Sequence, residues 1–296
     1  MANYLRPATD RPRRLRELLA APGPVLAPGV YDALGARLVE EAGFDVVYMT
    51  GFGTAASLLG RPDVGLLTMS EMVDNAHRIA QACDVPVIAD ADTGYGNAIN
   101  VVRTVQEYEQ AGVAAIHIED QLAPKRCGHM EGKQVIPTEE MLTKIRAAKA
   151  ARQSEDFVII ARTDARAVEG LPAALDRARR YGDAGADVLF VEAATSEEEI
   201  ETVASELAGV PLLFNWAEGG KTPPVPYDRL RDLGFAIVIY PIATLLTATA
   251  AIRSALADLK AAGTPIPIMD RMPRFSEFLE FIGLPEINDL EQQFLS

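Results

Sequence analysis

The sequence contains few cysteines, an excess of acidic over basic residues and no apolar segment of membrane-spanning length. Two cysteines in 296 residues are too few for a disulfide framework and indicate a reducing compartment. No apolar run approaches the roughly 20 residues of a transmembrane helix, and no apolar signal core follows the basic residues 11–16. We therefore expect a cytoplasmic protein without a membrane segment.

The charge balance narrows the range of partners. The formal net charge is −14, which disfavours nucleic acids and anionic membrane surfaces. An anionic small substrate is compatible with this charge, because a local basic pocket or a bound metal can outweigh the field of the whole molecule. We therefore expect a small-molecule partner rather than a nucleic acid or a membrane.

The chain also lacks linkers and low-complexity segments, and short apolar runs alternate with amphipathic segments along its length. Eight of these runs have the composition of parallel strands that are buried on both faces. Before several runs a glycine ends the helical segment, as in a left-handed C-cap. This pattern predicts a (β/α)8 barrel of residues 1–296 as one domain, with functional groups at the C-terminal ends of the strands. The predicted strands are residues 25–28, 46–49, 85–89, 114–118, 157–161, 188–191, 212–214 and 237–240.

An open doubly wound α/β sheet is the alternative architecture. Its dinucleotide fingerprint G-x-G-x-x-G does not follow the first predicted strand, and the glycine-containing segment 51–54 lacks the third glycine in register. Beyond the last strand, residues 243–296 form a C-terminal helical extension, with helical patterns at 243–262 and 275–282. We expect the apolar side chains of this extension to pack on another subunit.

Polar side chains follow the second to seventh predicted strands, a placement that chance seldom produces. Because the C-terminal ends of barrel strands meet at one rim, we expect these side chains to lie together. They are Tyr48, Thr50, Asp90, Asp92, Glu119, Asp120, Arg162, Asp164, Glu192, Asn215 and Glu218.

Four carboxylates of this region have the ligand chemistry of a hard metal ion. Asp90 and Asp92 alternate along an extended chain, so they share one face and repel each other unless a cation or a proton lies between them. Together with Glu119 and Asp63 they form an all-oxygen set, which favours Mg²⁺ or Mn²⁺ over Zn²⁺. The alternative is a set of helix caps and loop hydrogen bonds. His117, in the middle of a predicted strand, is expected to be an interior residue rather than a ligand.

The loop of residues 125–133 combines a thiol, an imidazole, several cations and two glycines. Because exposed free cysteines are usually avoided, we interpret Cys127 as part of an active site rather than as an incidental thiol in a solvated loop. The basic residues of the loop should favour its thiolate in the free protein, whereas a bound dianion should favour the thiol. Cys83 lies beside an apolar run and is expected to belong to the core.

Eight segments identify the sequence as a member of the isocitrate lyase/phosphoenolpyruvate mutase superfamily, and the K-R-C-G-H run is typical of its lyase branch. The resemblance covers almost the full chain. It implies a (β/α)8 barrel that is usually a homotetramer, built from two dimers whose subunits exchange their last helices. It also implies Mg²⁺-dependent cleavage or formation of a carbon–carbon bond next to a 2-hydroxy or 2-oxo acid, with Mn²⁺ as the alternative ion. The segments are YMTGFGTAAS (48–57), RPDVGLLT (61–68), DADTGYGN (90–97), HIEDQ (117–121), PKRCGHMEGK (124–133), ARTDA (161–165), NWAEGGKTP (215–223) and YP (240–241).

The resemblance also assigns roles to single residues. Asp92 corresponds to the direct metal ligand, and the residues that hold the metal through water are Asp63, Asp90 and Glu119. The family's Ser-Gly-Gly backbone cradle for a carboxylate is replaced by Thr50, Gly51 and Phe52, of which Phe52 narrows the pocket. The residues that contact the rest of the substrate are Gly128, His129, Arg162, Glu192, Asn215 and Pro241.

The implied reaction is the cleavage of C2–C3 in a malate-like 2-hydroxy dicarboxylate. The metal makes the 2-hydroxyl easier to deprotonate, and Tyr48 is the candidate residue that acts on this hydroxyl group. Cleavage releases pyruvate or a related 2-oxo acid and leaves a carbanion, whose charge Arg162 stabilises. Cys127 then protonates the carbanion as general acid, and Glu192 belongs to the same catalytic group.

Departures from related sequences indicate the substrate. The 2-methylisocitrate lyases have an arginine after C-G-H where this chain has Met130, which removes a cation from the region of the third carboxylate. The segment E-G-G-K-T-P (218–223) is similar to that of 2,3-dimethylmalate lyase and of the plant petal-death branch. We therefore predict a 2-alkylmalate such as 2,3-dimethylmalate as the substrate. Trp216 would also crowd a larger substituent if it faces the pocket.

Several alternatives stay open. A 2-methylisocitrate lyase differs only in one carboxymethyl arm of its tricarboxylate substrate. Oxaloacetate hydrolase or decarboxylase chemistry shares the loop, but that branch has a serine where this chain has Pro241. Phosphonate mutases lack the C-G-H run, so Cys127 argues against them. From another class, the barrel could be a non-catalytic oligomer that only binds dicarboxylates.

Overall fold

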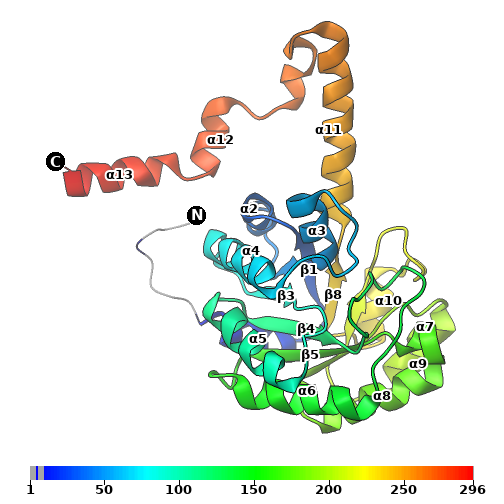
Figure 1. The fold of residues 1–296 in the computed structure, drawn as a ribbon. Helices are drawn as coiled ribbons and strands as arrows, with labels where there is room; N and C mark the ends of the chain where they lie inside the picture. Colours follow the sequence, from blue (N-terminus) through cyan, green and yellow to red (C-terminus); the bar gives the residue numbers. More distant parts are fainter. Residues whose placement is uncertain (1–4, 6–9, 296) are drawn as a thin grey trace. The chain divides into compact units, whose positions relative to one another are not determined.

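The computed structural model describes Leu5 and residues 10–295, and its centre is a parallel eight-stranded sheet that curls into a barrel (Figure 1). The strand order is β6-β5-β4-β3-β2-β1-β8-β7. A parallel bridge between Leu189 and Leu212 joins the two end strands, so the barrel is nearly closed. The predicted (β/α)8 fold is confirmed. The strands are β1 (Val25–Val30), β2 (Val47–Met49), β3 (Val87–Asp90), β4 (Ala115–Glu119), β5 (Val158–Thr163), β6 (Val188–Val191), β7 (Leu213–Asn215) and β8 (Ile237–Tyr240).

Helices connect successive strands and surround the barrel (Figure 1). Side-chain caps fix several of their starts. Thr68 and Glu71 form a capping box at the start of α4, which satisfies backbone N–H groups that would otherwise lack partners. The helices are α1 (Arg11–Ala20), α2 (Ala33–Glu41), α3 (Gly51–Leu59), α4 (Met69–Ala82), α5 (Ala98–Gln110), α6 (Thr138–Ala151), α7 (Ala165–Glu169), α8 (Leu171–Asp183), α9 (Glu197–Glu206) and α10 (Tyr227–Asp232).

The sequence predicted the strands closely. Each predicted strand overlaps one observed strand, and their ends differ by no more than two residues, which is the usual uncertainty of element boundaries. Parallel strands covered by helices are apolar on both faces, so each strand is a continuous apolar run.

The core consists of two hydrophobic clusters. One cluster lies in the barrel interior and contains alternate residues of the strands, such as Ile88, Ile160 and Leu213. Leu15 of α1 belongs to it and is fully buried. The other and larger cluster contains the opposite strand faces and the apolar faces of the surrounding helices. At the C-terminal rim of the barrel, polar side chains take the place of these apolar clusters.

The chain divides into two compact units, of which one is Asp10–Thr244 and the other includes Leu245–Ser296. In the second unit, Arg271 pairs with Asp258 of α11. The helices α11, α12 and α13 have no buried residue among those described. That residues 243–296 extend a single barrel domain and are exchanged between subunits stays a prediction. The elements here are α11 (Ala243–Ala262), η1 (Ile266–Arg271), α12 (Phe275–Phe281) and α13 (Leu284–Leu295).

Among the helices of the described residues, none has both the length and the apolar composition that a bilayer span requires.

Candidate active site

The polar side chains at the C-terminal rim point into the barrel because residues alternate along each strand. Ile88 and Ile160 belong to the interior cluster, so Asp90 and Arg162, which lie two residues farther along β3 and β5, point the same way. The parallel register places Glu119 of β4 beside Arg162. By the same alternation, further inward-pointing residues are His117, Glu192 and Asn215.

The rim encloses a cavity of about 200 Å³. The predicted site residues that line it are Tyr48, Thr50, Phe52, Asp63, Asp90, Cys127, Gly128, His129, Arg162, Glu192, Asn215 and Pro241. Other lining residues were not predicted to contact the substrate: Met130, Ala217, Glu218, Gly219, Gly220 and Ile242. Three predicted site residues do not line this cavity, namely Gly51, Asp92 and Glu119, and Asp92 lines a separate cavity together with Lys125.

The four predicted metal-binding carboxylates do cluster, and the ammonium group of Lys125 lies among them. Its Nζ atom is 2.7 Å from Oδ2 of Asp63 and 2.7 Å from Oδ1 of Asp92. On the other side of the cluster, Oε2 of Glu119 is 3.2 Å from Nη1 of Arg162. All of these side chains are buried. Sequence reasoning missed this position of Lys125, because a loop has no periodicity that fixes where its side chains point.

Burial and mutual repulsion dominate the electrostatics of this cluster. Burial first, and then the charges of Asp90 and Asp63, raise the pKa of Asp92 to about 6 although Lys125 opposes them. Burial also raises the pKa of Glu119 well above its usual range. Burial alone would lower the pKa of Lys125, but the carboxylates around it raise this pKa well above the ordinary lysine value. The cluster therefore holds negative charge that a further cation would stabilise.

The donor set fits a hard divalent cation. Within the described residues no three His, Cys, Asp or Glu side chains converge as a preformed metal site, and Lys125 lies between two of the carboxylates instead. Both carboxylate oxygens of Glu119 are nevertheless buried and accept no hydrogen bond, although Oε2 forms an ion pair with Arg162. Such oxygen atoms suit Mg²⁺ or Mn²⁺. The assignment of single metal ligands stays a prediction.

Arg162 is held in one orientation by carboxylates on two sides. Its Nε and Nη2 atoms donate to the two oxygens of Asp164 at 2.9 and 3.1 Å. Nη2 also lies 3.3 Å from Oε2 of Glu192, and the guanidinium carbon lies 5.3 Å from the ring centre of Phe190. This two-point bonding makes Arg162 a fixed cationic fork at the cavity wall.

Cys127 enters the cavity from the loop of residues 125–133. Its backbone N–H donates to the carbonyl of Asp63 at 3.2 Å, which ties the loop to the carboxylate cluster. Burial raises the pKa of the Cys127 thiol to about 11. The sequence left open whether the loop cations decide the protonation of Cys127, and in the structure desolvation outweighs them and favours the thiol. A thiol that keeps its proton is suited to act as a general acid.

His129 faces the cavity from the same loop. Its Nδ1 atom accepts a hydrogen bond from the backbone N–H of Lys221 at 3.0 Å, so a neutral ring carries its proton on Nε2. Burial lowers the pKa of His129, which favours this neutral form. Gly220 permits the contact, since a Cβ atom there would lie 2.7 Å from Nδ1. The E-G-G-K segment is therefore the support of the C-G-H segment.

Tyr48 and His117 form a buried pair beneath the cavity. The Tyr48 hydroxyl lies 2.9 Å from Nε2 of His117, which in turn lies 3.7 Å from Oδ1 of Asp90. Burial, reinforced by Asp90, raises the pKa of Tyr48 well above its usual range. His117 is completely buried, as expected for an interior residue. Sequence reasoning missed its contact with Tyr48.

The segment Thr50–Phe52 begins helix α3. The Thr50 hydroxyl accepts a hydrogen bond from the backbone N–H of Gly53 at 3.2 Å and so caps the helix. Gly51 lies against the carboxylate cluster, since a Cβ atom there would be 2.4 Å from Oδ2 of Asp90. The free N–H groups of a helix N-terminus favour anions, which agrees with a carboxylate cradle at this position.

Trp216 does not line the cavity. Its Nε1 atom donates to the carbonyl of Val225 at 3.0 Å, and its ring packs near Tyr240. Its neighbour Asn215 points inward instead and donates to Oε2 of Glu192 at 3.1 Å. Crowding of the substrate by Trp216 is therefore not supported, because alternation along β7 turns this side chain outward.

Comparison with known proteins agrees with this geometry. A family model described as phosphoenolpyruvate phosphomutase matches residues 15–260. The chain is 49% identical over 281 residues to 2,3-dimethylmalate lyase of Eubacterium barkeri, with 95% of this chain and 97% of that protein covered. It is 46% identical over 284 residues to 2-methylisocitrate lyase of Aeropyrum pernix, with 96% and 91% covered.

Solved structures show the same relationship. A crystal structure of 2,3-dimethylmalate lyase matches with a TM-score of 0.92 at 45% identity, covering 97% of this chain and 96% of that one. Oxaloacetate acetylhydrolase bound to 3,3-difluorooxalacetate matches with a TM-score of 0.89 at 42% identity, covering 95% and 96%. Phosphonopyruvate hydrolase in complex with oxalate and Mg²⁺ matches with a TM-score of 0.89 at 32% identity, covering 97% and 100%.

These matches confirm the identification that the sequence motifs support, and they confirm that the protein is an enzyme. A family model matches most of the chain, and two lyases match it over nearly its whole length. The chain therefore belongs to the PEP mutase/isocitrate lyase superfamily.

Proposed function

We propose that the protein is a Mg²⁺-dependent carbon–carbon lyase that cleaves C2–C3 of a 2-alkylmalate such as 2,3-dimethylmalate. The products are pyruvate, or a related 2-oxo acid, and a carboxylate. The observation that carries this proposal is one cavity lined by the Cys127 side chain, the guanidinium of Arg162 that Asp164 holds in place, and two carboxylates of the buried cluster, Asp63 and Asp90. The similarity to 2,3-dimethylmalate lyase supports the choice of substrate.

Binding of the substrate uses both sides of the cavity. The residues that would hold Mg²⁺ are Asp63, Asp90, Asp92 and Glu119, and the ion would supply Lewis-acid polarisation of the 2-hydroxyl and its neighbouring carboxylate. The N–H groups at the start of α3 bind that carboxylate. The Nε2–H group of His129 and the backbone N–H of Gly128 bind the distal carboxylate.

The residues of the chain then move two protons. The 2-hydroxyl gives its proton to the oxygen of Tyr48, which passes its own proton to Nε2 of His117 at 2.9 Å. The resulting alkoxide becomes the carbonyl of pyruvate as C2–C3 breaks, and the electron pair moves to C3 and its carboxylate, facing Arg162. The Sγ–H group of Cys127 protonates C3, which completes the saturated product.

The apolar part of the cavity favours an alkyl group over a third carboxylate. The apolar side chains that line it are Phe52, Met130, Ala217, Pro241 and Ile242. Met130 is half-buried at the cavity wall and carries no charge for an extra carboxylate. A charged arm on this wall would lose hydration without gaining a partner.

Pyruvate release, coupled to lactate dehydrogenase, tests the proposal. Purified protein with Mg²⁺ is assayed with 2,3-dimethylmalate, 2-methylmalate-type diacids and 2-methylisocitrate, with EDTA and Cys127→Ser as controls. We expect the alkylmalates to be preferred and both controls to be inactive. Wild-type turnover by Cys127→Ser would show that the role of Cys127 is wrong.

The alternatives correspond to other outcomes of the same assay. Preference for 2-methylisocitrate would keep the mechanism and overturn the choice of substrate, an alternative that the Aeropyrum pernix relative favours. Release of oxalate from oxaloacetate, without cleavage of any malate, would favour a hydrolase, as the similarity to oxaloacetate acetylhydrolase suggests. Binding of dicarboxylates without any metal-dependent turnover would indicate a non-catalytic oligomer.

We also propose that the enzyme is a homotetramer of helix-swapped dimers. Residues of α11–α13 carry exposed apolar side chains in the single chain, namely Leu246, Ile252, Leu256, Phe275 and Phe294. Apolar side chains of this number are usually covered in an assembly. Light scattering after size-exclusion chromatography should give a tetramer for the full chain.

The free thiols of Cys83 and Cys127 support a reducing compartment such as the cytoplasm.

A further inference from the structure

The loop of residues 125–133 has a buried lysine at each end. Lys125 is 4% exposed and Lys133 is 9% exposed, although lysines are almost never buried unless they are paired. Lys125 pairs with the carboxylate cluster. Lys133 pairs with a different group: its Nζ atom lies 3.0 Å from Oδ1 of Asp164, and it also donates to the carbonyl of Gly128.

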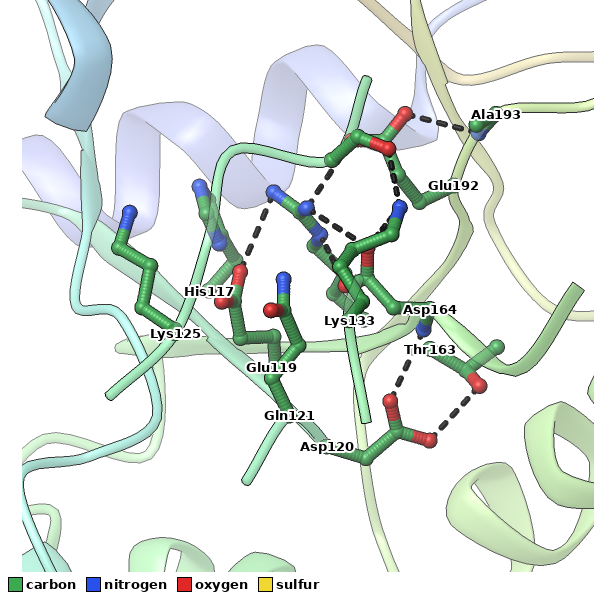
Figure 2. Close-up of polar contacts among 12 residues, drawn as sticks. His117, Glu119, Asp120, Gln121, Lys125, Lys133, Thr163, Asp164, Glu192 and Ala193 are labelled. Atoms are coloured by element: carbon green, nitrogen blue, oxygen red, sulfur yellow. Dashed lines mark hydrogen bonds and ion pairs between the residues drawn. The ribbon is translucent and has the colours of Figure 1, made fainter. Parts of the chain in front are cut away.

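Asp164 is held by several polar contacts, which Figure 2 draws. Its two oxygens accept from Arg162, and its backbone N–H donates to Oδ1 of Asp120 at 2.9 Å. Asp120 is itself held by the hydroxyls of Thr163 and Tyr181. A group that bonds to Asp164 is therefore bonded to the rigid end of strand β5.

The backbone of Gly128 lies directly against Arg162 and Glu192. A Cβ atom at Gly128 would lie 2.6 Å from Nη2 of Arg162 and 2.6 Å from Cγ of Glu192. In this position the Gly128 backbone lines the cavity and lies directly against the guanidinium. Because Lys133 bonds both to the Gly128 carbonyl and to Asp164, one ammonium group joins the loop to the carboxylate that orients Arg162.

We propose that Lys133 is a positioning residue that latches the loop of residues 125–133 over the cavity and couples its closure to the orientation of Arg162. Its effect on turnover rests on the proposed lyase function, whereas the latch itself does not. The chain offers a matched comparison in Lys221, whose ammonium also pairs with this loop, at Glu131. The side chain of Glu131 is 88% exposed, so that pair is a weak surface contact.

Alkylation of Cys127 measures whether the loop is closed. The chain has two cysteines, and Cys83 is fully buried, so iodoacetamide should modify only Cys127 in the folded protein. We expect Lys133→Met to raise the modification rate about tenfold or more, since a hydrogen bond to a charged group is lost. Lys133→Arg should give a smaller increase, and Lys221→Met should stay within about twofold of wild type.

The direction of this change separates loop opening from an electrostatic effect. Loss of a nearby cation raises a thiol pKa and slows alkylation, so acceleration can only report exposure. Alkylation of Lys133→Met at the wild-type rate would overturn the proposal, and so would equal acceleration by Lys221→Met. If Lys133→Met does not fold, acetylation of the wild-type protein decides: Lys221 should react at least about tenfold faster than Lys133, and equal rates would overturn the latch.

Turnover supplies a further readout that a purely structural role would not move. Lys133→Met should lower kcat/KM for the alkylmalate and weaken protection of Cys127 by oxalate with Mg²⁺, while its circular dichroism stays that of wild type. Unchanged kcat/KM and unchanged protection would overturn the coupling to Arg162. If wild type releases no pyruvate while Lys133→Met still accelerates alkylation, the lyase proposal fails and the latch stands.

Discussion

The Nζ atom of Lys125 lies 2.7 Å from Oδ1 of Asp92, so a loop ammonium occupies the carboxylate cluster that the sequence assigns to a metal. The same nitrogen pairs with Asp63. With the predicted metal bound, the lysine and the divalent ion would compete for the same oxygen atoms. The position of this loop lysine and the binding of the predicted metal would then be linked through Asp63 and Asp92.

This competition predicts a change in metal affinity. Lys125→Met should bind Mn²⁺ about tenfold more tightly than wild type, because a positive charge beside the ligands is removed. Electron paramagnetic resonance of free Mn²⁺ measures the affinity without any assay of turnover. Lys149→Met is the control, since Lys149 is exposed on α6. Equal affinities in all three proteins would show that Lys125 does not compete with the ion.

The sequence was sufficient for the barrel and for most of the rim. Buried parallel strands are continuous apolar runs, so their positions could be predicted closely, and the ends of these runs placed Asp90, Arg162 and Glu192 at one rim of the barrel. The contacts made by loops could not be predicted from the sequence. The pairing of Lys133 with Asp164 and the support of His129 by Lys221 join segments that are far apart in the chain.

The protonation of Cys127 shows a second limit of sequence reasoning. Counting cations in the loop favours a thiolate, but desolvation is the largest influence on this thiol and acts in the opposite direction. Burial is a property of the folded chain and cannot be read from the charges of neighbours. The direction of the Trp216 side chain could not be read from the sequence either. A tryptophan at this position suggested a wall of the substrate pocket, but its side chain points elsewhere and bonds to the carbonyl of Val225.

Gly128 should tolerate no side chain. A Cβ atom would lie 2.6 Å from Nη2 of Arg162, so Gly128→Ala should hold the loop away from the cavity and lower kcat/KM about 100-fold through misplacement of Cys127. The steady-state kinetics of pyruvate release measure this effect. Gly182→Ala is a control in helix α8, where the nearest atom would be 3.7 Å away. Similar losses in both variants would contradict the explanation.

The pH dependence of Cys127 follows from its burial. Because the thiol pKa is raised to about 11, the thiol keeps its proton at neutral pH and loses it only as the pH rises through that value. The rate of alkylation by iodoacetamide in the free enzyme should therefore keep rising above pH ~9, beyond the ordinary cysteine midpoint of about 8.5. A plateau near that ordinary midpoint would mean that the thiol is solvated.

Asp92→Asn should stabilise the metal-free protein while removing its response to Mg²⁺. Burial raises the pKa of Asp92 from 3.8 to about 6, so the ionised carboxylate opposes folding above pH 6. This opposition is on the order of 3 kcal/mol for such a shift. Asparagine removes the charge, and it tolerates the positive φ of 48° at this position nearly as well as aspartate does. Urea unfolding with EDTA at slightly alkaline pH should show a gain of about 1–3 kcal/mol.

The sign of the pH dependence makes this prediction specific. As the pH falls through about 6, wild-type Asp92 takes up its proton in the folded state and the opposition to folding disappears, so the advantage of Asp92→Asn should vanish near pH ~4. Added Mg²⁺ should stabilise wild type by mass action and leave the variant unchanged. Asp74→Asn, at an exposed pair with Arg78, should alter neither property. An unstable metal-free Asp92→Asn would mean that the pairing of Asp92 with Lys125 outweighs its burial.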